Sequence, residues 1–108
     1  MNNVIYIAGK MRGLIDYGRE HFRQAEAFLI GCFGWKVINP ASLPTGLPPY
    51  SYMPICLAML READAIGLLP DWEDSPGAKL EKRFAEETGK RIIFLAEEYG
   101  FEYEEDLE

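Results

Sequence analysis

One glutamate holds an unusual position in the helix that the sequence predicts after residue 75. Ser75 is a favourable N-cap, Pro76 fits the first helical position, and Gly77 leaves the first turn without a side chain. At about 100° per residue, Glu81 lies in a stripe made by Gly77, Ala78, Phe84, Ala85 and Thr88. A carboxylate directed toward the core, one turn behind a helix start that favours anions, is the pattern of a reactive group. The alternative is a rotated helix in which Leu80 faces the core and Glu81 lies at its boundary.

Tyr6 presents a related problem, because it lies in the apolar run 4–8, which is typical of a strand buried on both faces. A buried phenol needs a hydrogen-bond partner. Its hydroxyl could reach a backbone carbonyl at the strand end. It could instead reach Glu81, in which case one pair would satisfy both groups.

A glycine-flanked turn, Gly9 to Gly13, follows this strand and carries Arg12. Its spacing is neither that of a P-loop nor that of a dinucleotide-binding turn, so it indicates neither ATP nor a dinucleotide. A guanidinium at a strand end suits a phosphate or a carboxylate. The alternative is an ordinary turn with a solvated arginine. His21, the only histidine, has no identifiable Ser or Cys partner for catalysis.

The elements that position these residues follow from the apolar pattern. Four apolar runs predict strands at 4–8, 35–38, 65–69 and 91–95, and helical spacing predicts helices over about 16–33 and 51–63 before the Ser75-capped helix. The proline-rich segment 39–50 is a loop. Strands that alternate with helices predict a three-layer α/β domain with a mainly parallel sheet of four or five strands. Ligands of such sheets collect beyond the carboxyl ends of the strands, which is where we expect the site.

Helical projection also predicts which side chains face the core and which face solvent. In the first helix the inward positions are Phe22, Ala25, Leu29, Cys32 and Phe33. In the helix of Glu81 the outward positions are Lys79, Lys82, Arg83, Glu86 and Glu87. We expect Asp71, Glu73 and Asp74 to form a solvated loop, in which Trp72 covers a planar ligand or anchors a neighbouring subunit.

Length and charge limit the classes of partner. The chain has 108 residues and a net charge of −7, but segment 97–108 carries seven of the eighteen acids and no Lys or Arg. The remainder is neutral and has no basic stripe, so we expect a small ligand rather than polymeric nucleic acid. No apolar run is long enough to span a membrane and no signal peptide precedes the first strand. We therefore expect a cytoplasmic domain (1–96) with an acidic tail (97–108), free cysteines, no metal and no cofactor.

The order and spacing of several short motifs resemble the nucleoside 2-deoxyribosyltransferase superfamily. The similarity extends over nearly the whole chain up to about Leu95, and the branch that it matches best is DUF4406, small proteins often found in phages and bacteria. The pattern is also similar to the 2′-deoxynucleoside 5′-monophosphate N-hydrolases. The matching segments are residues 6–9, Arg12 with Gly13, residues 37–40, Ala63 with Asp64, and Ser75, Gly77 and Glu81.

The resemblance implies a flavodoxin-like fold and cleavage or transfer of an N-glycosidic bond. It implies that Glu81 attacks the anomeric carbon of the sugar, that Tyr6 orients this carboxylate, and that Ser75 holds a 5′-phosphate with the glycine-flanked turn. The substrate contacts that it implies are Gly9, Arg12, Gly13, Asn39, Cys56, Asp64, Ser75 and Gly77. It further implies a homodimer or a higher homo-oligomer, with sites near the subunit contacts.

The chain departs from the family pattern at Cys56, where the resemblance implies an aspartate that assists the leaving base. A neutral thiol is a poor proton donor, and loss of a general acid typically costs roughly 10²–10⁴-fold in rate. Either water or another group such as Asp64 takes over, or turnover is lost. Three hypotheses follow: an enzyme with Glu81 as nucleophile, a protein that binds and sequesters a nucleotide without cleaving it, and an interaction module that assembles through Trp72 and the tail.

Overall fold

Five strands form one sheet in the order β2-β1-β3-β4-β5 in the computed structural model, which describes residues 3–95 and 101–105. The strands are β1 (Val4–Ala8), β2 (Lys36–Ile38), β3 (Ala65–Leu68), β4 (Arg91–Leu95) and β5 (Phe101–Glu105). The first four are mutually parallel, and β5 pairs antiparallel with β4. This strand order is that of flavodoxin-like folds. The predicted fold class, a mainly parallel sheet of four or five strands, is confirmed.

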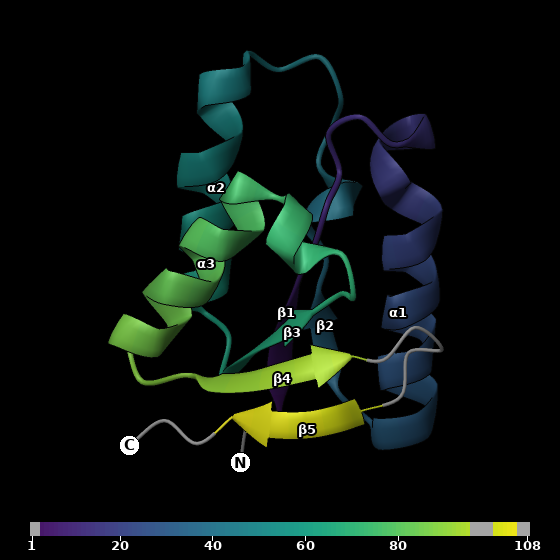
Figure 1. The fold of residues 1–108 in the computed structure, drawn as a ribbon. Helices are drawn as coiled ribbons and strands as arrows, with labels where there is room; N and C mark the ends of the chain where they lie inside the picture. The colour runs from purple at the N-terminus through teal and green to yellow at the C-terminus, as the bar shows by residue number, and fades with distance from the viewer. Residues whose placement is uncertain (1–2, 96–100, 106–108) are drawn as a thin grey trace.

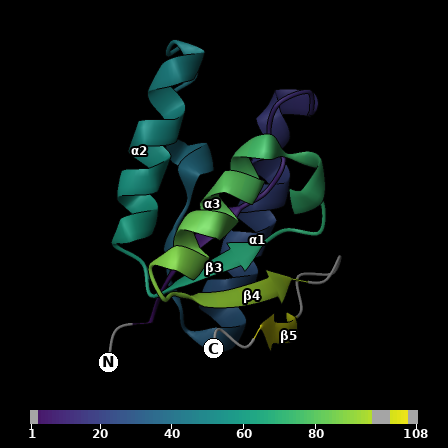
Figure 2. The same ribbon diagram turned by 60° about the vertical axis from the view of Figure 1, so that its left-hand side comes forward.

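Helices cover both faces of this sheet (Figure 1). Helix α1 (Arg19–Phe33) lies on one face, while α2 (Pro49–Arg61) and α3 (Pro76–Glu87) lie side by side on the other (Figure 2). Alternate residues of β1 enter the two cores, because successive side chains of a strand point to opposite faces. Ile5 and Ile7 pack with α1, whereas Tyr6 and Ala8 pack with α2 and α3. The predicted three-layer arrangement is confirmed.

Helix α1 begins three residues later than the apolar spacing predicts. Asp16 and Tyr17 have φ of 51° and 56°, and Gly18, the N-cap, has φ of 72°. Such left-handed backbone cannot continue into a right-handed helix, so the segment η1 (Ile15–Gly18) forms a separate turn. This turn leaves the side chain of Ile15 96% exposed.

The inward face of α1 is also shorter than predicted. Phe22, Ala25 and Leu29 are buried, but Cys32 and Phe33 are exposed. The chain reverses at Gly34 (φ 71°), and the amide of Trp35 donates to the Leu29 carbonyl. After this reversal the side chain of Trp35 packs in the core with Phe22, Ala25 and Leu29, and the strand begins at Lys36.

Helix α2 is shifted toward the N-terminus relative to the predicted range 51–63. It starts at Pro49, because a proline at the first helical position gives up an amide that would have no partner in the helix. No helix in residues 3–95 or 101–105 has the length and apolarity to cross a bilayer. The same residues contain no cluster of three metal-ligating side chains.

The backbone of residues 101–105 forms β5, within the range predicted as an acidic tail. The other residues of 97–108, and the side chains of the strand itself, lie outside the described part of the structure. The division into a domain and a tail therefore stays a prediction.

Candidate active site

The start of α3 is built as its sequence predicts. The Ser75 Oγ accepts a hydrogen bond from the amide of Ala78 at 3.1 Å, and Pro76 occupies the first helical position. Gly77 allows close packing against α2, since a Cβ at this position would lie 3.3 Å from the Cε of Met53. The predicted N-cap is confirmed, and it sets the rotation of the helix that carries Glu81.

Glu81 is the one charged side chain buried among the residues that the structure describes, with 6% of its surface exposed. The rotated alternative is wrong, because Leu80 is 47% exposed and points away from the core. The fully buried Tyr6 donates a hydrogen bond from its hydroxyl to Glu81 Oε2 at 2.5 Å. Of the two partners considered for the Tyr6 hydroxyl, the structure therefore selects Glu81, and each buried polar group satisfies the other.

Cys56 completes a cluster with Tyr6 and Glu81. It lies on α2, is 8% exposed, and packs in the same core as Tyr6. Its thiol is close enough to Tyr6 and Glu81 for the three groups to influence one another's pKa. We call Tyr6, Cys56 and Glu81 the buried cluster. Three elements distant in sequence, β1, α2 and α3, each contribute one of its polar groups.

Burial sets the protonation of this cluster. Desolvation raises the pKa of Glu81 to about 7, although the hydrogen bond from Tyr6 acts in the opposite direction. Desolvation also raises the pKa of Tyr6 far above its usual range and raises the pKa of the Cys56 thiol. Near neutral pH the phenol and the thiol are therefore protonated, while Glu81 is divided between its acid and carboxylate forms.

The turn after β1 packs directly on the end of β3. The Leu69 amide donates to the Ala8 carbonyl at 2.8 Å, and a Cβ at Gly9 would lie 2.7 Å from the Leu69 side chain. The Lys10 amide donates to Asp71 Oδ1 at 3.0 Å, so Asp71 joins the two strand ends rather than lying free in a solvated loop. These ends flank the topological switch point, where ligands of such sheets bind.

Arg12 and Gly13 lie exposed at the outer part of this turn. Gly13 has φ of 86°, a left-handed conformation that favours glycine. The turn therefore presents a guanidinium to solvent beside the switch point.

Two of the predicted substrate contacts lie apart from the buried cluster. Asp64 precedes β3 and accepts a hydrogen bond from the Val4 amide at 3.0 Å, which places it at the amino ends of the strands. Asn39 caps a short turn by accepting from the Ala41 amide, and it donates to Glu26 at 2.8 Å. The structure therefore does not bring Asp64 to the edge where Tyr6 and Glu81 meet.

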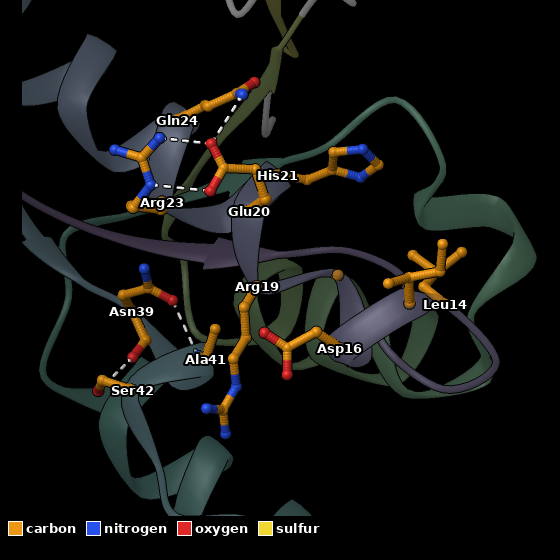
Figure 3. A pocket seen from close by; sticks show the side chains of 12 residues that line it. Leu14, Asp16, Arg19, Glu20, His21, Arg23, Gln24, Asn39, Ala41 and Ser42 are labelled. Atoms are coloured by element: carbon orange, nitrogen blue, oxygen red, sulfur yellow. Dashed lines mark hydrogen bonds and ion pairs between the residues drawn. The ribbon is translucent and has the colours of Figure 1, made fainter.

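A cavity of about 860 Å³ lies between the start of α1 and the segment after β2 (Figure 3). Asn39, Ser42 and Arg19 line it, and the Arg19 guanidinium donates to the Leu43 carbonyl at 3.2 Å. No member of the buried cluster lines this cavity, which belongs to the α1 side of the sheet. Its size alone therefore does not identify it as the reactive centre.

The side chain of Lys82 does not extend into solvent, as helical projection predicts, but lies against Trp72. Its ammonium lies 5.4 Å from the centroid of the Trp72 ring and accordingly only 15% of the side chain is exposed. The Trp72 ring also packs against Phe94, with centroids 5.9 Å apart. A long side chain can bend back over its helix toward an aromatic face, and the direction of Cβ does not reveal this.

Comparisons with known proteins agree with this fold. Residues 3–94 match the model of a family described as a domain of unknown function, DUF4406. Among solved structures, a 2-desoxiribosyltransferase from Leishmania mexicana superimposes with a TM-score of 0.68 at 19% identity, over 94% of this chain and 79% of that protein. At this identity the likeness demonstrates a shared fold. A comparison of the sequence with curated proteins found no match.

Proposed function

The chain belongs to the DUF4406 family, and it buries a carboxylate against a tyrosine between the sheet and α3. On this ground we propose that it is an enzyme acting on N-glycosidic bonds. Its substrate is a deoxynucleoside or a deoxynucleoside 5′-monophosphate. The observation that carries the proposal is the 2.5 Å contact between Tyr6 and the buried Glu81. Structural ion pairs rarely leave a lone carboxylate in an apolar core, whereas active sites often do. The shared fold with a deoxyribosyltransferase supports the choice of substrate class.

In the proposed reaction the Glu81 carboxylate attacks the anomeric carbon of the sugar. The C–N bond breaks, its electron pair leaves with the base, and a glycosyl ester forms on Glu81. Water then attacks the same carbon in a hydrolase, or a second base does so in a transferase, and the carboxylate is released. This is the two-step scheme of retaining glycosidases. Tyr6 holds the attacking carboxylate in one orientation through its hydroxyl.

The remaining groups of this edge suit the 5′ end of the substrate. Arg12 and the backbone of the Gly9 to Gly13 turn can hold a phosphate, as can Ser75 and the first turn of α3 beside Gly77. Asn39 lies at the carboxyl end of β2 and can contact the part of the substrate that extends over the sheet. The departing base takes its proton from water. Asp64 lies at the opposite edge of the sheet, and the raised pKa of the Cys56 thiol makes it a poor proton donor.

A second candidate function is binding without turnover. The observation that favours it is Cys56 itself, a neutral thiol where the resemblance implies a carboxylic acid. A protein of this kind would sequester or sense a nucleotide with the same phosphate contacts.

One experiment separates the two functions. The protein is incubated with a panel of deoxynucleosides and their 5′-monophosphates, free base is measured by chromatography, and binding is measured by calorimetry. Release that Glu81→Ala abolishes supports the enzyme, and Glu87→Ala is the matched control because this exposed residue lies on the same helix. Binding without release supports the second function. Absence of both refutes both.

We also propose that the chain works as a homodimer or a higher homo-oligomer. Two strongly exposed apolar side chains, Ile15 (96%) and Tyr50 (80%), lie on segments at the same end of the molecule, η1 and the start of α2 (Figure 1). Light scattering after gel filtration measures the mass in solution. A mass of one chain at micromolar concentration would contradict this proposal.

A further inference from the structure

Met53 and Gly77 form an outer layer above the polar groups of the buried cluster, where helices α2 and α3 run side by side (Figure 2). Met53 lies one turn before Cys56 on α2, and Gly77 lies one turn before Glu81 on α3. Both helices begin at the carboxyl ends of the strands, because each connects one parallel strand to the next. Met53 and Gly77 are therefore closer than the cluster to the edge where ligands of such sheets bind.

The end of the Met53 side chain covers the first turn of α3. A Cβ on Gly77 would lie 3.3 Å from the Met53 Cε and 3.8 Å from the Ser75 Oγ, so the methyl group and the hydroxyl flank the same point. Because Gly77 has no side chain, nothing separates the methyl group from the backbone of this turn. An apolar group thus lies directly beside the hydroxyl and the backbone that suit the 5′ end of the substrate.

The first turn of α3 has few donors left for a phosphate. Pro76 has no N–H, and the Ala78 amide donates to the Ser75 Oγ at 3.1 Å. The following amide makes the first backbone bond of the helix. Among the described residues none accepts a hydrogen bond from the Gly77 amide. The free donors of this turn are that amide and the hydroxyl proton of Ser75, and the Met53 methyl group lies beside both.

We propose that Met53 is a specificity-determining residue, which admits the 5′-hydroxyl of a deoxynucleoside and disfavours a 5′-monophosphate. A hydroxyl is small and neutral. A phosphate is larger and charged, and a methyl group cannot replace the water that it gives up. Methionine has three rotatable bonds, so its side chain can swing aside and the preference is graded rather than absolute. This role rests on the proposed function, and it selects the deoxynucleoside over its 5′-monophosphate as the substrate.

The ratio of two rates tests this preference. For each chain kcat/KM is measured for a deoxynucleoside and for the 5′-monophosphate of the same base, and the second value is divided by the first. If the protein binds without turnover, association constants from calorimetry take the place of the rates. Arg12 is unchanged in every variant, so its attraction for the phosphate cancels. The parent ratio should lie below one, and Met53→Ala should raise it about tenfold, the scale on which apolar pockets discriminate by size.

Two further variants separate the size of this side chain from other causes. Met53→Leu keeps a similar volume and should keep the parent ratio. Met59→Ala removes the same atoms from the same helix, but Met59 lies near the other end of α2 and packs against the core that contains Tyr6. This control should lower the stability of the protein and leave the ratio unchanged.

A titration without substrate tests the contact between Met53 and α3 by itself. Inorganic phosphate is added to the isotopically labelled protein, and the amide signal of Gly77 is followed by NMR. In Met53→Ala this amide should respond at a lower phosphate concentration than in the parent chain, because its cover is removed.

Two results would overturn the proposal: a Met53→Ala ratio equal to that of the parent, or a Gly77 amide that responds equally to phosphate in both chains, including no response in either. If Met53→Ala responds at lower phosphate but no chain binds or cleaves a nucleoside or nucleotide, the proposed function is refuted. The place of Met53 over the first turn of α3 would then stand.

Discussion

Replacing Glu81 by glutamine should stabilise the protein at alkaline pH, relative to the parent chain, and have much less effect at acidic pH. Glu81 ionises near pH 4.5 when it is solvated, but burial raises its pKa in the folded protein to about 7. Between these values the folded state binds a proton that the unfolded state has lost. The stability that this proton contributes is fully present below pH 4.5 and is lost as the pH rises through 7.

The size of the effect follows from the same two pKa values. Over this window the parent chain loses about 1.4 kcal/mol per pH unit, or about 3 kcal/mol in all. Glutamine does not titrate, and its amide oxygen can still accept the hydrogen bond from Tyr6. The free energy of unfolding of the variant, minus that of the parent, should therefore rise by about 3 kcal/mol between pH 4.5 and pH 8.

Urea denaturation at several pH values, followed by circular dichroism, measures this difference. Subtracting the parent from the variant cancels the titration of all other groups, including Glu20, whose pKa is lowered by its hydrogen bond to Arg23. Glu87→Gln is the control, because Glu87 is exposed on the same helix and should give a difference that does not vary with pH. A difference that is equally constant for Glu81→Gln would refute the reasoning that a desolvated carboxyl lies at this position.

Three further predictions concern neighbouring features. Tyr6→Phe leaves Glu81 without its hydrogen bond, so the Glu81 pKa should rise above 7 and the protein should lose about 1.5–3 kcal/mol of stability at pH 8, measured by NMR titration and urea denaturation. Gly9→Ala forces a Cβ to within 2.7 Å of Leu69 and should lower the stability of the protein by about 1–3 kcal/mol. Gly31→Ala lies in open space on α1 and should instead raise the stability by about 0.5–1 kcal/mol. Equal melting temperatures for the two variants would contradict this prediction. If the protein releases base, kcat/KM should rise with pH through about 7 as Glu81 ionises, and a flat pH profile would argue against its role as nucleophile.

Helical periodicity and capping preferences predicted the environment of a side chain correctly where that environment depends only on its own helix. The N-cap at Ser75 and the inward direction of Glu81 follow from helical periodicity, and the structure agrees with both. The same periodicity was insufficient for Lys82, because its long side chain bends onto Trp72 from another segment. It was also insufficient at Asp16, where a left-handed turn replaces the first turn of the predicted helix.

The position of Asp64 illustrates a different limit. Its assignment as a substrate contact came from a resemblance between motifs, although the residue precedes its strand and so belongs to the amino edge of a parallel sheet. The order of elements along the chain already contained that information. Asp71 gave no such local signal, since its contact with the Lys10 amide exists only once β1 and β3 are neighbours.

The sequence by itself determined the fold class and the carboxylate that faces inward from α3. These features depend on periodicity and on the order of strands and helices, which are properties of the chain alone. The tertiary structure decided which groups meet. Tyr6, Cys56 and Glu81 lie up to 75 positions apart, and only the packing of α2 and α3 on β1 brings them into one buried cluster. The pKa of Glu81 is likewise a tertiary property, because desolvation comes from the side chains that surround it.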